Sequence, residues 1–307
     1  MNDTTALAVF AYRRPAHLTR VLQTLQIQLE QRPHPVHLFL DGAQGEHDAS
    51  AVHACHIVAE QYSREIDLMI HNSSINRGLY RSLTEGVSEV LDQYPQLIVL
   101  EDDILTSSHF LPYMLDGLRC YADEPRVASI HGYTPPIPVE LPETFFLRGA
   151  DCWGWATWRD RWKLFRSDAA AMAAEIRERG LSADFDLGGR VPNLHLLDAK
   201  AAGRSNSWAI CWHASCFLAD RYTLHPGRSL VRNIGLDYSG EHCAPSASLE
   251  AVLTDTPLPV FRQKVEENPA IVAAFARQIA PAPLPVRVIR RLRTAFLNRT
   301  AAQRPAS

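Results

Sequence analysis

The 307-residue sequence has no long apolar run, no strong net charge and no internal repeat. A membrane-spanning helix needs about 20 predominantly apolar residues. No stretch reaches that length, so we expect no transmembrane segment. The formal net charge is only −3, so bulk electrostatics give no reason to expect a nucleic-acid partner. Residues 1–5 are polar and lack the features of a secretory signal, which predicts a cytoplasmic protein.

Cysteine is also scarce, with six in the chain. In a cytoplasmic protein these are expected to be reduced thiols rather than a disulfide framework. Cys211 and Cys216 flank an apolar segment that contains His213, but structural zinc ligands usually come as pairs separated by two to four residues. Positions 211 and 216 would also lie on different faces of a helix. The spacing therefore does not predict a zinc site.

What the chain does have is a regular alternation of apolar strands and amphipathic helices in its first 131 residues. This alternation predicts an α/β fold with a mostly parallel sheet flanked by helices. In such folds ligands bind outside the carboxyl ends of the strands. Strands are expected at 6–12, 36–40, 66–71, 97–100 and 127–131, and helices from Pro15 through Leu25 and at 49–62, 82–94 and 110–123.

Three carboxylates follow the apolar run 97–100 directly, namely Glu101, Asp102 and Asp103. They are expected at the carboxyl end of a buried strand. Adjacent carboxylates repel one another, so a cation is expected to offset the repulsion. A divalent metal that carries a phosphate satisfies this requirement. The alternative is an acidic turn on the surface.

Polar residues also follow the three earlier strands. Arg13 and Arg14 follow the first strand, Asp41 follows the second, and the turn Asn76-Arg77-Gly78 follows the third. Because these strand ends share one sheet edge, the residues could together form a nucleotide pocket. A guanidinium suits phosphate oxygens, and Asp41 could accept the N3–H of a uracil.

Beyond residue 131 the sequence changes character. Strands are expected at 145–148 and 222–226 and helices at 169–179 and 208–219. The segment 153–162 holds four of the six tryptophans. Aromatic rings of this kind either stack on sugars or pack in a core, and we expect one of Trp153, Trp155 and Trp158 to face an acceptor. Gly154 would let the backbone approach a ligand closely.

The C-terminal segment from Pro281 is basic, with arginines interleaved with apolar residues as in an amphipathic helix. Such a helix could contact the inner face of a membrane peripherally, or it could be a solvated tail. We expect a first half at 1–128, a smaller second half at 129–262 and a helical basic tail at 263–307.

Several of these motifs resemble one enzyme family. The first strand ending in Arg-Pro, Asp41, the Asn-x-Gly at 76–78 and the acid triplet resemble nucleotide-sugar glycosyltransferases of the GT-A (Rossmann-like) fold. The segments Trp-Gly-Trp-Ala-Thr-Trp (153–158) and Asn-Ile-Gly-x-Asp-x-Ser-Gly-x-His-Cys (233–243) are similar to bacterial family-2-type transferases related to the N-acetylglucosaminyltransferase I class. The resemblance spans about residues 6–243, and it implies that residues 1–128 are the nucleotide-sugar-binding half and residues 129–262 the acceptor-binding half of one GT-A domain.

The resemblance implies metal-dependent, inverting transfer of a hexosyl or N-acetylhexosaminyl group from a nucleotide-diphospho-sugar, with uridine as the expected base. The acceptor hydroxyl would belong to a glycan, a lipid-linked glycan or a protein, as in bacterial surface glycan or glycoconjugate synthesis. The acid triplet corresponds to the family's Asp-x-Asp-type motif. Asp103 and His242 would then hold Mn²⁺ or Mg²⁺. Asp102 would face the donor ribose or sugar, and Glu101 would be a structural acid bonded to backbone or to a basic residue.

The remaining roles follow from the same resemblance. Arg14, Asn76 and Arg77 would line the nucleotide and phosphate site, and Asp41 would contact the base. An inverting transfer needs a carboxylate base. Related sequences can carry an aspartate where this chain has Ala209, which leaves Asp151, Asp237 and Glu241; Asp237 is the first candidate and Asp151 the second.

Two other functions stay open. A sugar-nucleotide nucleotidyltransferase would share the sheet and the carboxylates, but it typically has a glycine-rich loop where this chain has Arg13-Arg14-Pro15. A non-catalytic carbohydrate- or partner-binding domain on a transferase scaffold is favoured by Ala209. The acid triplet and His242 argue against it.

Overall fold

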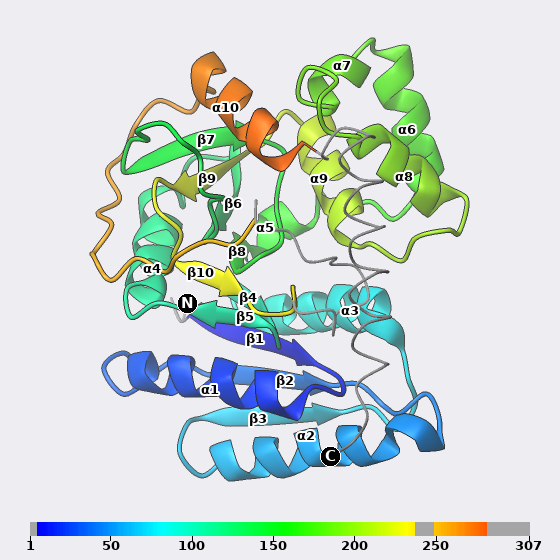
Figure 1. Ribbon diagram of the computed structural model, residues 1–307, viewed down its shortest axis with the longest axis vertical. Helices are drawn as coiled ribbons and strands as arrows, with labels where there is room; N and C mark the ends of the chain where they lie inside the picture. The colour runs from blue at the N-terminus through cyan, green and yellow to red at the C-terminus, as the bar shows by residue number, and fades with distance from the viewer. Residues whose placement is uncertain (1–4, 237–248, 281–307) are drawn as a thin grey trace, which may run out of the picture.

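The computed structural model describes residues 5–236 and 249–280 (Figure 1). It confirms the predicted α/β class: strands in the order β3-β2-β1-β4-β8-β6-β9-β7 form one large sheet with helices on both faces. A two-stranded sheet, β10-β5, lies beside it. The strands are β1 (Thr5–Ala11), β2 (Val36–Leu40), β3 (Leu68–Asn72), β4 (Gln96–Glu101), β5 (Ile104–Thr106), β6 (Val127–His131), β7 (Thr144–Arg148), β8 (Trp155–Trp158), β9 (Tyr222–Pro226) and β10 (Val231–Asn233).

Helices cover the sheet because alternate residues of its strands point to opposite faces. In β1, Leu7 and Val9 contact the core beneath α1, α2 and α4, whereas Ala8 and Phe10 contact the core beneath α3 and α9. The helices are α1 (Pro15–Leu29), α2 (Glu46–Tyr62), α3 (Gly78–Gln93), α4 (Phe110–Cys120), α5 (Arg159–Trp162), α6 (Ala169–Glu178), α7 (Ser182–Phe185), α8 (Asn193–Ala201), α9 (Ala209–Leu218) and α10 (Pro269–Ile279).

The strand order reverses beside β1, which makes this the topological switch point of the sheet. β1 pairs in parallel with β2 on one side and with β4 on the other. In open α/β sheets, the crevice that binds ligands forms where the order reverses, outside the carboxyl ends of the strands. Here that position lies between the residues after Ala11 and the acids after Leu100.

The tryptophan segment contains a strand that the sequence did not predict. Residues of β8 pair antiparallel with β4 on one side and with β6 on the other, so β8 is inserted between two strands that run the same way. Trp155 and Trp158 are almost fully buried there. The sheet is therefore mixed, and its parallel part contains the switch point.

Most predicted elements agree with the structure to within a few residues. The largest differences are at helix ends. α3 begins at Gly78, four residues before the predicted start, because Asp41 accepts hydrogen bonds from the first N–H groups of the helix. α4 ends at Cys120, three residues before the predicted end. The short helices α5, α7 and α8 and the strands β5 and β10 were not predicted.

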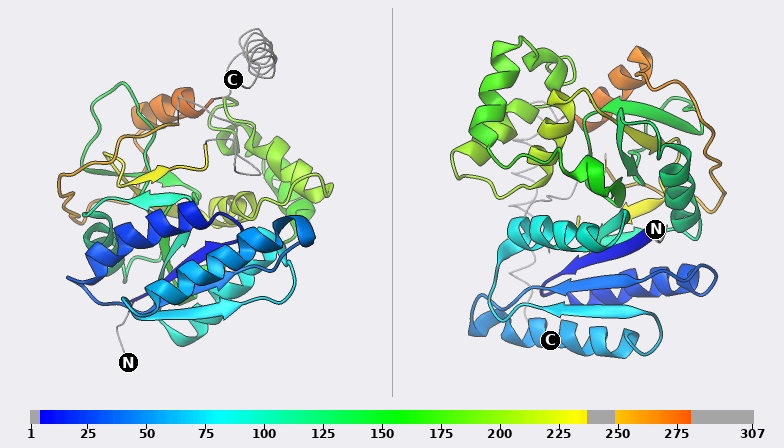
Figure 2. Two further views of the ribbon diagram at one scale, coloured as in Figure 1. Left: turned by 60° about the horizontal axis from the view of Figure 1, so that its bottom comes forward. Right: turned by 180° about the vertical axis from the view of Figure 1, so that it is seen from behind.

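The second half of the chain adds a helical lobe and a terminal helix. Helices α6 to α9 share one apolar core and stand at the opposite end of the molecule from α2 (Figures 1 and 2). α10 packs Phe275 against Phe145 and Leu147 of β7, so this part of the predicted tail lies against the sheet. Residues 281–307, including the predicted basic helix, lie outside the described residues. In the described part of the chain, no helix is both long and apolar enough to cross a membrane.

Trp155 is expected to be a major contributor to stability. Its side chain is fully buried, and its ring lies 5.4 Å from that of Trp208 and 6.0 Å from that of Trp212. Truncating Trp155→Ala should lower the free energy of unfolding by about 3–5 kcal/mol because it removes buried area and leaves a cavity. Chemical denaturation measures this change. Ile57→Ala, at a site 54% exposed on α2, is the control and should change little. A loss below about 1 kcal/mol for Trp155→Ala would contradict the described core.

Candidate functional site

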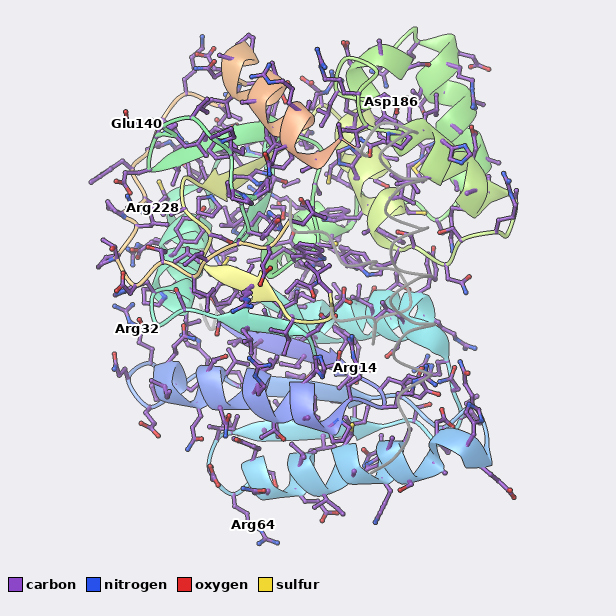
Figure 3. The ribbon with its side chains drawn as sticks, in the orientation of Figure 1. Arg14, Arg32, Arg64, Glu140, Asp186 and Arg228 are labelled. Carbon is purple, nitrogen blue, oxygen red and sulfur yellow. The ribbon has the colours of Figure 1, made fainter. Side chains whose placement is uncertain are left out.

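A cavity of about 430 Å³ lies at the switch point of the sheet. We call it the switch-point pocket. Its walls come from the segment after β1, the residues after β2, the start of α3, the acid triplet, Trp153 and the segment 205–209. Figure 3 labels Arg14 at this edge, beside the carboxyl end of β1. The predicted residues Arg14, Asp41, Asn76, Asp102 and Asp103 all line this pocket.

Arg14 joins the two aspartates of the acid triplet. One guanidinium nitrogen donates to Asp102 Oδ1, and Nη1 lies 3.0 Å from Asp103 Oδ2. Burial alone would lower the pKa of Arg14, but the attraction of both carboxylates outweighs it and raises that pKa. Burial raises the pKa of Asp102 despite this guanidinium. Arg14 is therefore fixed as a cation at the carboxyl ends of β1 and β4.

Glu101 also lines the pocket, where its partner is Trp208 rather than the backbone or basic residue that the sequence predicted. Burial is the largest cause that raises the pKa of Glu101 to about 8, and repulsion from Asp103 and Asp102 adds to it. A carboxyl with this pKa is mostly protonated at neutral pH, so Asp102 and Asp103 are the two anionic carboxylates that share the Arg14 guanidinium. The cluster has more negative charge than Arg14 neutralises, which favours a further cation.

The residues at this edge fit a divalent cation that is coordinated mainly by the phosphates of a bound substrate and by water. Among the described residues, no three His, Cys, Asp or Glu side chains converge as a metal site. Mg²⁺, however, is usually bound by one or two carboxylates together with substrate phosphates and water. Asp103 Oδ2 faces Arg14, and no described residue hydrogen-bonds to Oδ1. Asp103 can therefore supply one oxygen ligand at the edge of the pocket. His242, the second predicted ligand, lies outside the described residues.

Asp41 is held by the start of α3. Its Oδ1 accepts from the Arg77 backbone N–H at 2.8 Å and its Oδ2 from that of Gly78 at 2.8 Å. Asn76 donates to the Gly42 carbonyl at 2.9 Å, which closes the same turn. These bonds position Asp41 at the wall of the pocket and leave Oδ2 with a second lone pair for a ligand donor.

Arg77 does not occupy the predicted position. Its guanidinium pairs with Glu85 on α3, and the side chain is not part of the pocket wall. Glu85 lies eight positions further along the chain, on α3, and the long side chain of Arg77 reaches it. In this structure only the Arg77 backbone N–H, which donates to Asp41, serves the site, and the phosphate contact of its guanidinium stays a prediction.

Tyr12 and Gln44 are pocket residues that the sequence did not predict. The Tyr12 hydroxyl donates to Asp48 and accepts from the Gln44 backbone N–H at 3.2 Å. Burial, and then the bond to Asp48, raise the pKa of Tyr12 to about 12, so the phenol stays neutral. An aromatic residue directly after a buried strand was the available signal, since it lies at the ligand-binding edge.

The segment at the end of β10 lies against the acid triplet. β10 pairs with β5, and this pairing carries the chain to the acid cluster, where the Ile234 N–H donates to the Asp103 carbonyl at 2.8 Å. A Cβ at Gly235 would come within 2.9 Å of Arg14 Nη1 and closer still to Asp103 Oδ2. The sequence resemblance singles out this segment without indicating that its backbone rests on Asp103. Asp237 lies outside the described residues.

We expect Gly235→Ala to lower activity without unfolding the protein. The added methyl group would displace Asp103 and Arg14, and a misplacement of about 1 Å can cost about 100-fold in rate. Steady-state kinetics with a nucleotide-sugar would measure the loss. Gly45→Ala is the matched control because a Cβ there meets only the His47 ring, at 3.2 Å. Equal activity in both variants would show that this close approach is unimportant.

Asp151 lies in a second cavity, of about 250 Å³, next to the switch-point pocket. The two cavities share Leu196, Ser207 and Ala209 in their walls. Asp151 Oδ1 accepts from the Cys152 N–H at 2.8 Å, and its Oδ2 lies 3.9 Å from His131 Nδ1. Of the two predicted bases, Asp151 is therefore the one that the described structure places beside the pocket.

The tryptophan segment separates into one pocket residue and two core residues. Trp153 lines the switch-point pocket, whereas Trp155 and Trp158 are buried in the sheet. Gly154 lies in the wall of neither described cavity; its backbone has a φ of +66°, and a Cβ there would meet Val231 at 2.8 Å. The requirement for glycine at 154 therefore comes from backbone conformation and packing.

No protein-family model and no curated protein matches this chain. Similar solved structures include mannose-1-phosphate geranyltransferase from Thermus thermophilus, at 16% identity and TM-score 0.38, with 76% of each chain covered. Glucosyl-3-phosphoglycerate synthase from Mycobacterium tuberculosis, solved with Mn²⁺, UDP and glucosyl-3-phosphoglycerate, has 10% identity and TM-score 0.36, covering 66% of this chain and 80% of that chain. Similarity at this level carries no argument about activity.

Proposed function

We propose that the protein is a metal-dependent glycosyltransferase that moves a sugar from a nucleotide-diphospho-sugar, most simply a UDP-sugar, to a hydroxyl acceptor. The observation that carries this proposal is the buried cluster of Arg14 with Glu101, Asp102 and Asp103 at the sheet's switch point. One fixed cation and an excess of carboxylates suit a divalent metal and a diphosphate together. The adjoining pocket has room for the nucleoside and the sugar.

Different residues around the pocket would contact different parts of the donor molecule. Tyr12, Asp41 and Asn76 form the end that would take the nucleoside, with Asp41 Oδ2 free to accept one further hydrogen bond. Arg14 would balance the charge of the diphosphate. Asp103 would hold Mn²⁺ or Mg²⁺, and such an ion stabilises the charge that develops on a leaving diphosphate. Asp102 would orient Arg14 and face the ribose or sugar.

The short connection between β1 and α1 favours glycosyl transfer over nucleotidyl transfer. Only residues 12–14 separate β1 from α1, and Arg14 is already paired with the acids. A glycine-rich phosphate loop, which a sugar-nucleotide nucleotidyltransferase would place there, has no room in this connection. The phosphate contacts must instead come from Arg14 and a bound cation.

Asp151 is our candidate for the carboxylate that removes the proton from the acceptor hydroxyl. It lies in the cavity that adjoins the pocket, so an acceptor entering from that side would reach it before it reached the donor. Asp237 is the alternative. Ala209, which both cavities share, cannot serve as a base. We propose inverting transfer because of the sequence resemblance to inverting transferases, and such a transfer needs a carboxylate base.

Nucleotide titration tests the proposal. Intrinsic tryptophan fluorescence of the full chain should change on addition of UDP or a UDP-sugar, because Trp153 and Trp208 line the pocket. The response should strengthen with Mn²⁺ or Mg²⁺. Parallel titrations with GDP, GDP-sugars, CDP and dTDP identify the base. If no nucleotide alters the fluorescence or gives heat in calorimetry, the protein is better described as a non-catalytic binding domain.

A further inference from the structure

We propose that the second cavity, bounded by Arg148–Asp151, Ser207–His213 and α10, is the acceptor subsite and that it binds an uncharged sugar residue. The inference rests on the proposed function. The cavity has a volume of about 250 Å³ and shares Leu196, Ser207 and Ala209 with the switch-point pocket. A group bound there would therefore lie directly beside a group bound in the pocket, as two reacting sugars must.

The cavity combines apolar walls with a few polar groups that have unused hydrogen-bonding capacity. Leu147, Ile210, Phe275 and Ile279 contribute apolar surface. Such a surface suits the C–H faces of a sugar ring, and placed polar groups fix its orientation.

The polar groups of the cavity are arranged to bind hydroxyl groups. Asn193 donates through Nδ2 to the Phe185 carbonyl at 2.8 Å, so its amide oxygen is left to accept. Ser207 Oγ accepts weakly from the Ile210 N–H at 3.4 Å, so its hydroxyl hydrogen is left to donate. Asp151 uses one oxygen for the Cys152 N–H and keeps further lone pairs. A hydroxyl-bearing ligand can pair with all three.

The charges around the cavity exclude a strongly anionic ligand. Among the described residues, Arg148 is the one arginine or lysine in the wall, and its guanidinium is engaged by Asp220 at 3.2 Å, by the Phe217 carbonyl at 3.2 Å and by the Phe217 ring. Asp151 would repel a phosphate or a carboxylate. Burial lowers the pKa of His213 and lowers that of His225 to about 3, so neither imidazole adds positive charge.

Buried histidines also fix the backbone that forms the wall between the two cavities. His213 Nδ1 lies 2.8 Å from the Ala150 carbonyl oxygen and 3.2 Å from the Ala150 backbone nitrogen, and His131 Nε2 accepts from the Trp153 N–H at 3.1 Å. Asp151 lies between these two fixed points. Its carboxylate is thereby held in the second cavity, and the next two residues of the chain, Cys152 and Trp153, line the switch-point pocket.

Saturation-transfer NMR with full-length protein tests the assignment. The probes are the methyl glycosides of glucose, galactose, mannose and N-acetylglucosamine, with glucose 6-phosphate and methyl glucuronide as charged comparators. Ile279→Trp should fill the cavity and lower binding of the best neutral glycoside at least about tenfold. Arg277→Trp, an exposed position on the same helix that is not in the cavity wall, should leave binding unchanged. Thermal unfolding checks that both variants are folded.

Asn193→Leu gives a second test from the opposite wall and should weaken the same glycoside without changing affinity for UDP. The inference is overturned if no neutral glycoside binds, if Ile279→Trp and Asn193→Leu both leave binding intact, or if the charged sugars bind more tightly. Calorimetry with UDP separates the two proposals. UDP binding without glycoside binding would contradict the acceptor subsite alone. Glycoside binding without any nucleotide binding would contradict the transferase proposal.

Discussion

Asp103→Asn should lower the rate of sugar transfer about 1,000-fold, because a metal ion on a leaving diphosphate stabilises the transition state by several kcal/mol and each ~1.36 kcal/mol is tenfold in rate. Asparagine keeps the shape of the side chain and can still accept from Arg14, which lies 3.0 Å from Asp103 Oδ2. The fold should therefore be retained. Initial rates of UDP release, measured across a Mn²⁺ titration, report the effect.

Asp116→Asn is the matched control, since Asp116 is paired with Arg119 on the surface of α4, away from the pocket. This variant should keep wild-type rates and the same dependence on Mn²⁺. An Asp103→Asn protein that retains both the rate and the metal dependence would show that the metal is held elsewhere. If Asp103→Asn loses activity while the metal dependence of UDP binding is unchanged, the metal is likewise held by other residues.

Asp151→Asn should lower kcat for transfer about 1,000-fold while leaving donor affinity unchanged, because general-base catalysis contributes between about 100- and 10,000-fold. The amide keeps the bond from the Cys152 N–H but cannot take a proton. Single-turnover transfer and UDP calorimetry together separate these two quantities. Donor affinity is the informative control, since Asp151 lies in the acceptor-side cavity and not in the switch-point pocket.

The same assay on Asp237→Asn decides between the two candidate bases. If Asp237→Asn abolishes transfer and Asp151→Asn does not, the base comes from the segment beyond β10. If neither variant loses transfer, neither Asp151 nor Asp237 removes the proton. His131 is a neighbour that can orient the Asp151 carboxylate, since its Nδ1 lies 3.9 Å from Asp151 Oδ2. Its pKa is lowered by burial to about 3, so it acts as a neutral neighbour.

The fold class and the donor side of the site could be predicted from local patterns. Alternating strands and helices in residues 6–131 predicted the α/β architecture, which the structure confirms. Parallel strands bring their carboxyl ends to one edge, so the residues that follow successive strands could be grouped from their order in the chain. Arg14, Asp41, Asn76 and the acid triplet were found in this way, and all of them line one pocket.

The contacts that decide individual roles could not be predicted, because most of them depend on how side chains meet in the folded protein. Arg77 lies in the predicted turn at 76–78, but its side chain forms an ion pair with Glu85 on α3. Trp208 donates to Glu101 from a segment more than one hundred positions away. The position of β8 between β4 and β6 also depends on how well its side chains pack against both neighbouring strands, which the sequence of β8 alone does not reveal.

The amino-acid pattern alone therefore determined an α/β sheet with an acidic, arginine-balanced edge, since hydrophobic periodicity and strand-end polarity are local properties. Tertiary packing alone decided that Gly235 rests on Asp103, that Trp153 faces the pocket while Trp155 is buried, and that Asp151 occupies a separate cavity. These positions follow from how the second half of the chain folds back onto the strand ends of the first. That long-range arrangement leaves no signature in any one stretch of sequence.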